Sequence, residues 1–181
     1  MRKNNSKIKR VAFGGMVAGL SVCLMMLTGV FSVLVYATPI IVGLLLMLMV
    51  IEIGKRWALM VYVVVSLLSF FFLANKESAI IYIAFFGYYP ILKPILEGIK
   101  IRAVEWILKF VIFNVAVIAA YFVLIKFFGI DISSQYMSMK TGSLVLLALG
   151  NVLFLVYDIA FTRLVTAYVT VWYKIVRNFF R

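Results

Sequence analysis

Six long apolar segments follow one another along this chain, and short charged or polar stretches separate all but the first two. A helix needs roughly 20 residues to cross the hydrocarbon core of a bilayer, and most of the segments have that length. Hydrophobic residues make up 66% of the 181 residues and charged residues 13%, which excludes an ordinary water-soluble domain. The sequence therefore predicts an all-α polytopic membrane protein, a compact bundle of about six transmembrane helices in a single integral-membrane domain over 1–181. The expected spans are about 11–29, 31–53, 57–74, 79–92, 106–128 and 143–162.

The fourth segment is the least regular of the six. It covers only 79–92, and a Gly-Tyr-Tyr-Pro sequence at 87–90 interrupts it. Proline removes a backbone donor for which lipid offers no replacement, so we expect a kinked or broken helix here. Charged and aliphatic residues are mixed over 95–105, which predicts a short interfacial helix between spans four and five. An amphipathic cytoplasmic tail is expected over 163–181.

The charges predict an orientation. Eighteen lysines and arginines against six acidic residues give a formal net charge of +12. With the amino terminus in the cytoplasm, most of this surplus lies in inner loops, as the positive-inside rule requires. We therefore expect a multi-pass protein of the cell (plasma) membrane with both termini cytoplasmic. The basic surface indicates a lipid bilayer with anionic headgroups as a partner, and not nucleic acid.

The residue types exclude several kinds of chemistry. The chain has no histidine, which removes imidazole metal sites and histidine-based catalytic triads. The single cysteine, Cys23, lies inside an apolar segment and has no intrachain disulfide partner. Nucleotide-binding and hydrolase motifs are absent from the sequence. We expect a protein that binds and docks, with no enzymatic activity, cofactor or metal of its own, so that energised uptake needs a partner.

The first segment carries two interleaved pairs of small residues four positions apart. Gly14 pairs with Ala18, and Gly15 pairs with Gly19. Such a pattern makes a flat stripe on a helix, against which a second helix can pack closely. The stripe is either a packing groove within the bundle or a docking surface for an external helical partner.

Polar residues inside the later spans are candidate functional groups, because each is costly in hydrocarbon. Asn114 and Asn151 are expected at similar depth, either as a hydrogen-bonded amide pair or as the polar floor of a ligand cavity. Asp158 lies deeper, with Arg163 or Lys109 within reach as a counter-ion. We interpret this acid as part of a structural ion pair, with a proton relay as the alternative.

Aromatic and polar residues gather toward the expected outer side. Together with the two asparagines they supply the groups that a small planar or zwitterionic ligand would need. The candidate ligand-binding residues are Asn75, Lys76, Glu77, Tyr82, Asn114, Tyr121, Gln135 and Asn151.

The chain as a whole resembles a known family. A basic amino terminus and a small-residue first helix are followed by a second segment with the early Pro39 and by a charged turn before Trp57. This pattern is similar to that of the substrate-binding S component of energy-coupling factor (ECF) transporters, which take up vitamins and micronutrients in bacteria. The resemblance implies that the first helix docks on a transmembrane T component driven by two ATPases, with the small-residue stripe at the matching place. It also implies a small-molecule ligand in an outward-facing cavity lined by the later helices.

Two other classes stay open at this stage. One is a structural membrane scaffold of the rod-shape or division type, which uses packing faces in place of a pocket. The other is a self-sufficient facilitator or lipid-handling protein, in which the break at 87–90 would line a path.

Overall fold

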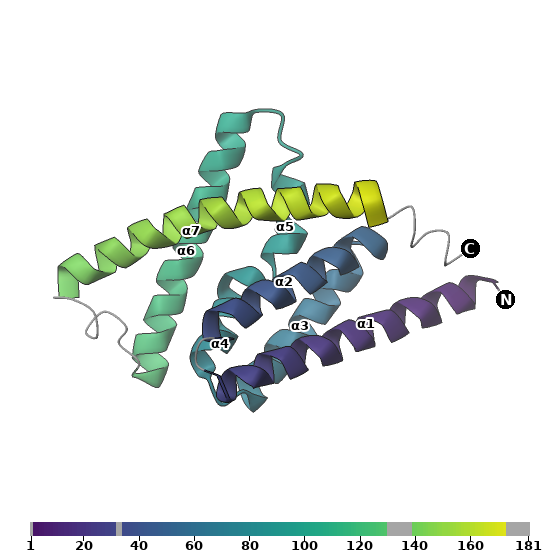
Figure 1. Ribbon diagram of the computed structural model, residues 1–181, viewed down its shortest axis with the longest axis horizontal. Coiled ribbons are helices and arrows are strands. Elements are labelled where there is room, and N and C mark those ends of the chain that lie inside the picture. Colours follow the sequence, from purple (N-terminus) through teal and green to yellow (C-terminus); the bar gives the residue numbers. More distant parts are fainter. Residues whose placement is uncertain (1, 32–33, 130–138, 173–181) are drawn as a thin grey trace. The chain divides into compact units, whose positions relative to one another are not determined.

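The computed structural model describes residues 2–31, 34–129 and 139–172, and all the regular secondary structure in these ranges is helical (Figure 1). The chain divides into two compact units, Met1–Asp131 and Ile132–Arg181, and each is described by itself. The first unit contains α1 (Arg2–Met26), the 3-10 turn η1 (Leu27–Gly29), α2 (Leu34–Glu52), α3 (Lys55–Phe72), α4 (Lys76–Ile81), the π-helical segment η2 (Tyr82–Phe86), α5 (Tyr89–Leu96) and α6 (Arg102–Phe128). The second contains α7 (Met139–Ala167) and the π-helical η3 (Tyr168–Trp172).

Six helical stretches within the described residues are long and apolar enough to cross a membrane. The predicted all-α class with six such helices is therefore confirmed. The stretches are Lys7–Gly29, Leu34–Glu52, Lys55–Phe72, Lys76–Leu96, Arg102–Phe128 and Leu147–Thr170. The fourth stretch includes α4, η2 and α5, so the predicted irregularity is present, although the helical region extends beyond 79–92 at both ends.

The predicted interfacial helix over 95–105 was wrong. α5 ends at Leu96, residues 97–101 form turns and irregular backbone, and α6 begins at Arg102. Of the charged residues that suggested an amphipathic helix, Glu97 pairs with Lys93 and Lys109, and Glu105 pairs with Lys109. α7 continues through residue 163 to Ala167, and the cytoplasmic amphipathic tail over 163–181 stays a prediction.

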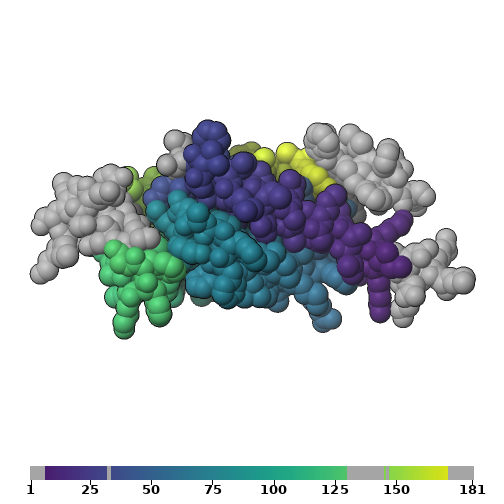
Figure 2. All heavy atoms as spheres, turned by 90° about the horizontal axis from the view of Figure 1, so that it is seen from below, coloured from purple at the N-terminus to yellow at the C-terminus, as the bar shows by residue number. Residues whose placement is uncertain are grey.

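The core of the first unit is formed where α1, α2 and α3 pack against one another. Its buried side chains are aliphatic, and Val42, Leu46 and Met49 of α2 are completely buried. In Figure 2 the purple side chains of α1 run alongside the blue and teal side chains of the segments that follow it. α2 also contacts α4 and α5, and α6 contacts α4 and η2. The irregular fourth span is therefore enclosed between α2 and α6.

In the second unit, Phe154, Asp158 and Phe161 recur at helical spacing on one face of α7. Threonine hydroxyls of α7 donate hydrogen bonds to carbonyl oxygens one turn earlier on the same helix. Thr162 donates to Asp158 O at 2.9 Å, and Thr166 donates to Thr162 O at 2.9 Å.

Candidate functional site

The fourth span changes helix type near its middle. After the six residues of α4 the backbone widens into the π-helical segment Tyr82–Phe86, and the Gly87 amide donates to Tyr82 O at 2.8 Å. A bond between residues five apart is the π-helical pattern, which occurs mostly as single turns within α-helices and often at functional sites. The chain then turns at Gly87 and Tyr88 before α5 begins, with Pro90 in its first turn. Proline is tolerated there because the first amides of a helix have no partner within it.

Tyr62 of α3 supports this change of helix type. Its hydroxyl donates to Ile83 O at 2.9 Å, which gives a carbonyl of the π segment a partner that lipid would not supply. Its ring lies directly over Gly87, where an added Cβ would be 2.5 Å from Tyr62 Cδ2 and 2.9 Å from Tyr82 Cζ. Glycine is therefore required at position 87 by the close approach of two rings.

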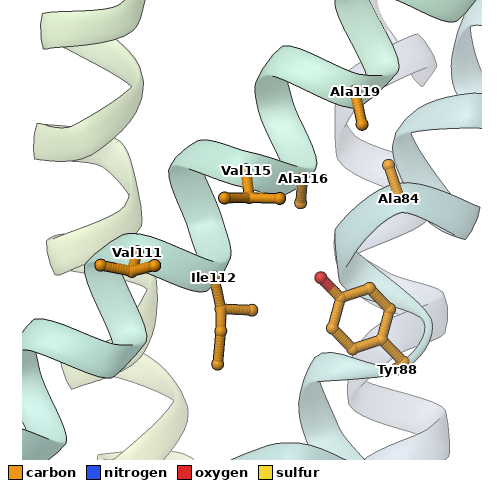
Figure 3. A pocket seen from close by; sticks show the side chains of 7 residues that line it. All are labelled: Ala84, Tyr88, Val111, Ile112, Val115, Ala116 and Ala119. Carbon is orange, nitrogen blue, oxygen red and sulfur yellow. The ribbon is translucent and has the colours of Figure 1, made fainter.

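A cavity of about 270 Å³ opens beside the break, between this segment and α6. Its lining is almost entirely aliphatic, and Figure 3 shows the side chains from the two sides facing one another. The lining residues are Ala84, Tyr88, Val111, Ile112, Val115, Ala116 and Ala119. Tyr88 lies 12 residues after the start and eight before the end of the span Lys76–Leu96, so the cavity is near mid-depth.

Tyr88 supplies the polar group of this cavity. Figure 3 shows its hydroxyl oxygen directed toward α6. The ring is held edge-on by two neighbours, with centroids 6.3 Å from Tyr62 and 6.3 Å from Phe85. Within the described part of the chain, the hydroxyl has no hydrogen-bond partner. A donor with a fixed direction thus faces an apolar space.

The predicted ligand-binding residues at the start of the fourth span lie outside this cavity. Asn75 directly precedes α4 and is partly exposed. Lys76 donates to Phe70 O at 2.8 Å, and Glu77 accepts a hydrogen bond from the Tyr36 hydroxyl. These contacts connect α4 to the end of α3 and the start of α2.

Tyr82 is also outside the cavity, in the core. Its side chain is 0% exposed and its ring lies 6.0 Å from that of Tyr62. Its hydroxyl has no hydrogen-bond partner among the described residues.

The two membrane asparagines bond their own helices. Asn114 donates to Phe110 O at 2.8 Å on α6, and Asn151 donates to Leu147 O at 2.8 Å on α7. The predicted contact between them would join the two units and stays a prediction. Tyr121 is partly buried on α6, with its ring 6.4 Å from that of Phe122, and Gln135 lies outside the described residues.

Two lysines and two glutamates form an ionic network between the end of α5 and the start of α6. Lys93 Nζ lies 2.8 Å from Glu97 Oε1, and Lys109 Nζ lies 2.7 Å from Glu105 Oε1 and 3.4 Å from Glu97 Oε1. Both lysines are 2% exposed. Sequence analysis missed this network, although the spacing of four residues within the pairs 93/97 and 105/109 was a readable signal.

Lys109 was proposed as a counter-ion for Asp158, as was Arg163. Lys109 lies in the first unit with Glu97 and Glu105 as ionic partners, and Asp158 is 3% exposed on α7 in the second. Arg163 is exposed on α7. The ion pair of Asp158 stays a prediction.

The four small residues of α1 lie on two different faces. Gly14 and Ala18 are turned into the bundle, and an added Cβ on Gly14 would be 3.2 Å from Met49 Cε. Gly15 and Gly19 are exposed, and nothing lies within 4 Å of an added Cβ on either. The two interpretations of the stripe therefore apply to different pairs: packing within the bundle describes Gly14 and Ala18, and only Gly15 and Gly19 are open.

Comparison with known proteins places the chain in no family. No protein-family model, no curated protein and no solved structure matches it. Six long apolar helices, one of them broken beside a mid-depth cavity, indicate a multi-pass membrane protein.

Proposed function

We propose that this protein is the membrane-embedded substrate-binding subunit of a small-molecule uptake system. The observation that supports it most directly is the cavity of about 270 Å³ at the break of the fourth span. Discontinuous membrane helices commonly form substrate sites near mid-depth, because the interrupted backbone and neighbouring side chains line a space that is protected from lipid. A scaffold that acts through packing faces has no need for such a space.

In this proposal the subunit docks through α1 on a transmembrane coupling partner that separate ATPases drive, as in ECF transporters. The open pair Gly15 and Gly19 supports this arrangement, because small exposed residues four positions apart allow a partner helix to approach the backbone closely. The chain has no nucleotide-binding motif, so ATP-driven uptake would need another subunit. The proposed orientation has both termini in the cytoplasm, where the basic residues meet anionic lipid.

Affinity purification from the membranes of the native host in mild detergent tests this function. We expect the wild-type protein to copurify with an ATPase activity, and we expect the Gly15→Leu/Gly19→Leu double variant to lose it while remaining folded. Ala103→Leu is the matched control, because Ala103 is exposed on α6 and far along that helix from the cavity. An equal ATPase activity in the double variant and the wild type would contradict docking through this face.

Mass spectrometry of the same preparation tests the binding function. A small molecule that remains bound through purification, and is lost when Ala119→Leu fills the cavity, is the expected result. Cell-wall enzymes in place of an ATPase, with no retained small molecule, would identify a scaffold.

A further inference from the structure

The mid-depth cavity also indicates which class of molecule it takes, and this step rests on the proposed function. We propose that the ligand is an uncharged, largely apolar molecule with one hydrogen-bond acceptor, such as a ring-bearing ketone, and that Tyr88 donates to this acceptor. Of the planar and zwitterionic molecules that the sequence left open, this class excludes the zwitterionic one.

The side chains that line the cavity indicate that most of the ligand is apolar and uncharged. Six of the seven lining side chains are alanine, valine or isoleucine, and none is charged. A charged or zwitterionic molecule placed here would lose its hydration without gaining an ionic partner, which is costly. The charged side chains of Lys93, Glu97, Glu105 and Lys109 pair with one another outside this lining.

The Tyr88 hydroxyl indicates that the ligand carries a hydrogen-bond acceptor. Its hydroxyl is directed into the cavity and has no protein partner in the described part of the chain, and a polar group at mid-depth costs free energy unless something accepts its proton. The edge-on rings of Tyr62 and Phe85 hold the phenol in place, so the direction of the donor is set before a ligand binds.

At the depth of the cavity, a phospholipid chain supplies no acceptor for the Tyr88 hydroxyl. At mid-depth an acyl chain presents only CH₂ and CH₃ groups, because its ester carbonyls remain near the interface, roughly 15 Å away in a bilayer core of about 30 Å. A lipid tail would fill the space and leave the hydroxyl without a partner. The volume of about 270 Å³ is at the small end of ligand sites, which agrees with a compact molecule.

Benzophenone is a suitable probe, because it is apolar, uncharged and has one carbonyl acceptor. On irradiation its excited carbonyl removes a hydrogen atom from a nearby C–H group, and the two carbon radicals then join, which marks the residues beside it. The protein is reconstituted in lipid nanodiscs, irradiated with benzophenone and digested, and the labelled residues are identified by mass spectrometry. We expect labelling to concentrate between Val111 and Ala119 on α6.

Two comparisons test the role of the hydroxyl. In the wild-type protein kept in the dark, so that neither competitor reacts, displacement of tritiated benzophenone is measured at equilibrium. Diphenylmethane has the same two rings without the carbonyl, and we expect it to compete roughly fivefold less well than 4-methylbenzophenone does, the ratio for one neutral hydrogen bond. In Tyr88→Phe this difference should disappear. Ala119→Leu should abolish labelling of α6, and Ala103→Leu should retain it.

Equal competition by the two compounds in the wild-type protein would overturn the proposal, and that comparison requires no variant to fold. Labelling spread evenly over all exposed spans would overturn it as well. If the purified protein instead retains a charged or zwitterionic molecule, the proposed uptake function stands and this ligand class is wrong. If benzophenone labels the cavity as expected but no ATPase copurifies, the ligand class stands and the uptake function is wrong.

Discussion

The ring of Tyr62 occupies the space into which a side chain at Gly87 would extend, with Tyr62 Cδ2 only 2.5 Å from the position of an added Cβ. This contact joins α3 to the break in the fourth span at the point where the π segment ends. Because the same tyrosine also donates to Ile83 O at 2.9 Å, the ring cannot move away without losing that hydrogen bond. The break is thus held by both a steric and a polar contact from one residue.

Gly87→Ala should therefore destabilise the fold. The added methyl group must displace the Tyr62 ring, and overpacking of this kind typically costs about 1–3 kcal/mol. The measurement is the thermal unfolding midpoint in detergent micelles, with Gly15→Ala as the control because its added Cβ meets nothing within 4 Å. Equal midpoints for the two variants would show that the ring moves freely.

Lys109→Met should destabilise the junction of α5 and α6. The change keeps the long apolar stem but removes the charge that lies 2.7 Å from Glu105 Oε1 and 3.4 Å from Glu97 Oε1. Loss of one partner from a buried ion pair costs about 3–5 kcal/mol, and the lower end is expected because the Glu97 side chain is 38% exposed. Lys100→Met is the control at an exposed lysine in the same region. Chemical denaturation in mixed micelles measures the free energy of unfolding of both variants. If Lys100→Met loses as much stability as Lys109→Met, the ionic network does not stabilise the junction.

Gly14→Leu and Gly15→Leu should affect different properties. The first places a large side chain against Met49 and Val61 in the core and should lower the yield of folded protein, whereas the second points into open space and should leave folding unchanged. Size-exclusion profiles of the two purified variants provide the measurement. A folded, monodisperse Gly14→Leu protein would mean that α1 packs through a different face.

The orientation of the chain can be tested by cysteine labelling on a Cys23→Ala background. Ala74→Cys lies between the third and fourth spans and Lys100→Cys lies between the fourth and fifth, and both positions are exposed. With cytoplasmic termini, a membrane-impermeant maleimide added to intact cells should label the first position and not the second. The reverse pattern would invert the proposed topology.

Hydropathy predicted six membrane-spanning helices because charged residues separate most of the apolar segments. Hydropathy does not predict which side of such a helix faces the core. A helix that is apolar on all sides has no sequence signal that separates its buried side from its lipid-facing side. Gly14 and Gly15 illustrate this limit: their spacings are equivalent in the sequence, and only the packing of α1 against α2 and α3 separates them.

The candidate ligand residues were chosen for their polarity, and this criterion did not identify the residues that line the cavity. Asn114 donates one amide hydrogen to Phe110 O on its own helix, so a polar residue in a span can make a local contact. Tyr88 belonged to the predicted break but was not among the candidates. Its significance depends on the direction of its hydroxyl, which follows from the turn after the π segment and from the neighbouring rings.

The π segment also sets the direction, about the helix axis, in which the later side chains of the fourth span point. A π turn contains about one residue more than an α turn, so the later residues are rotated by roughly 100° from where an uninterrupted α-helix would place them. Deleting one residue from Tyr82–Phe86 would turn Tyr88 away from α6 and Lys93 away from its present surroundings, with the other spans unaltered. The length of this segment therefore sets the direction of the Tyr88 hydroxyl together with the rings of Tyr62 and Phe85.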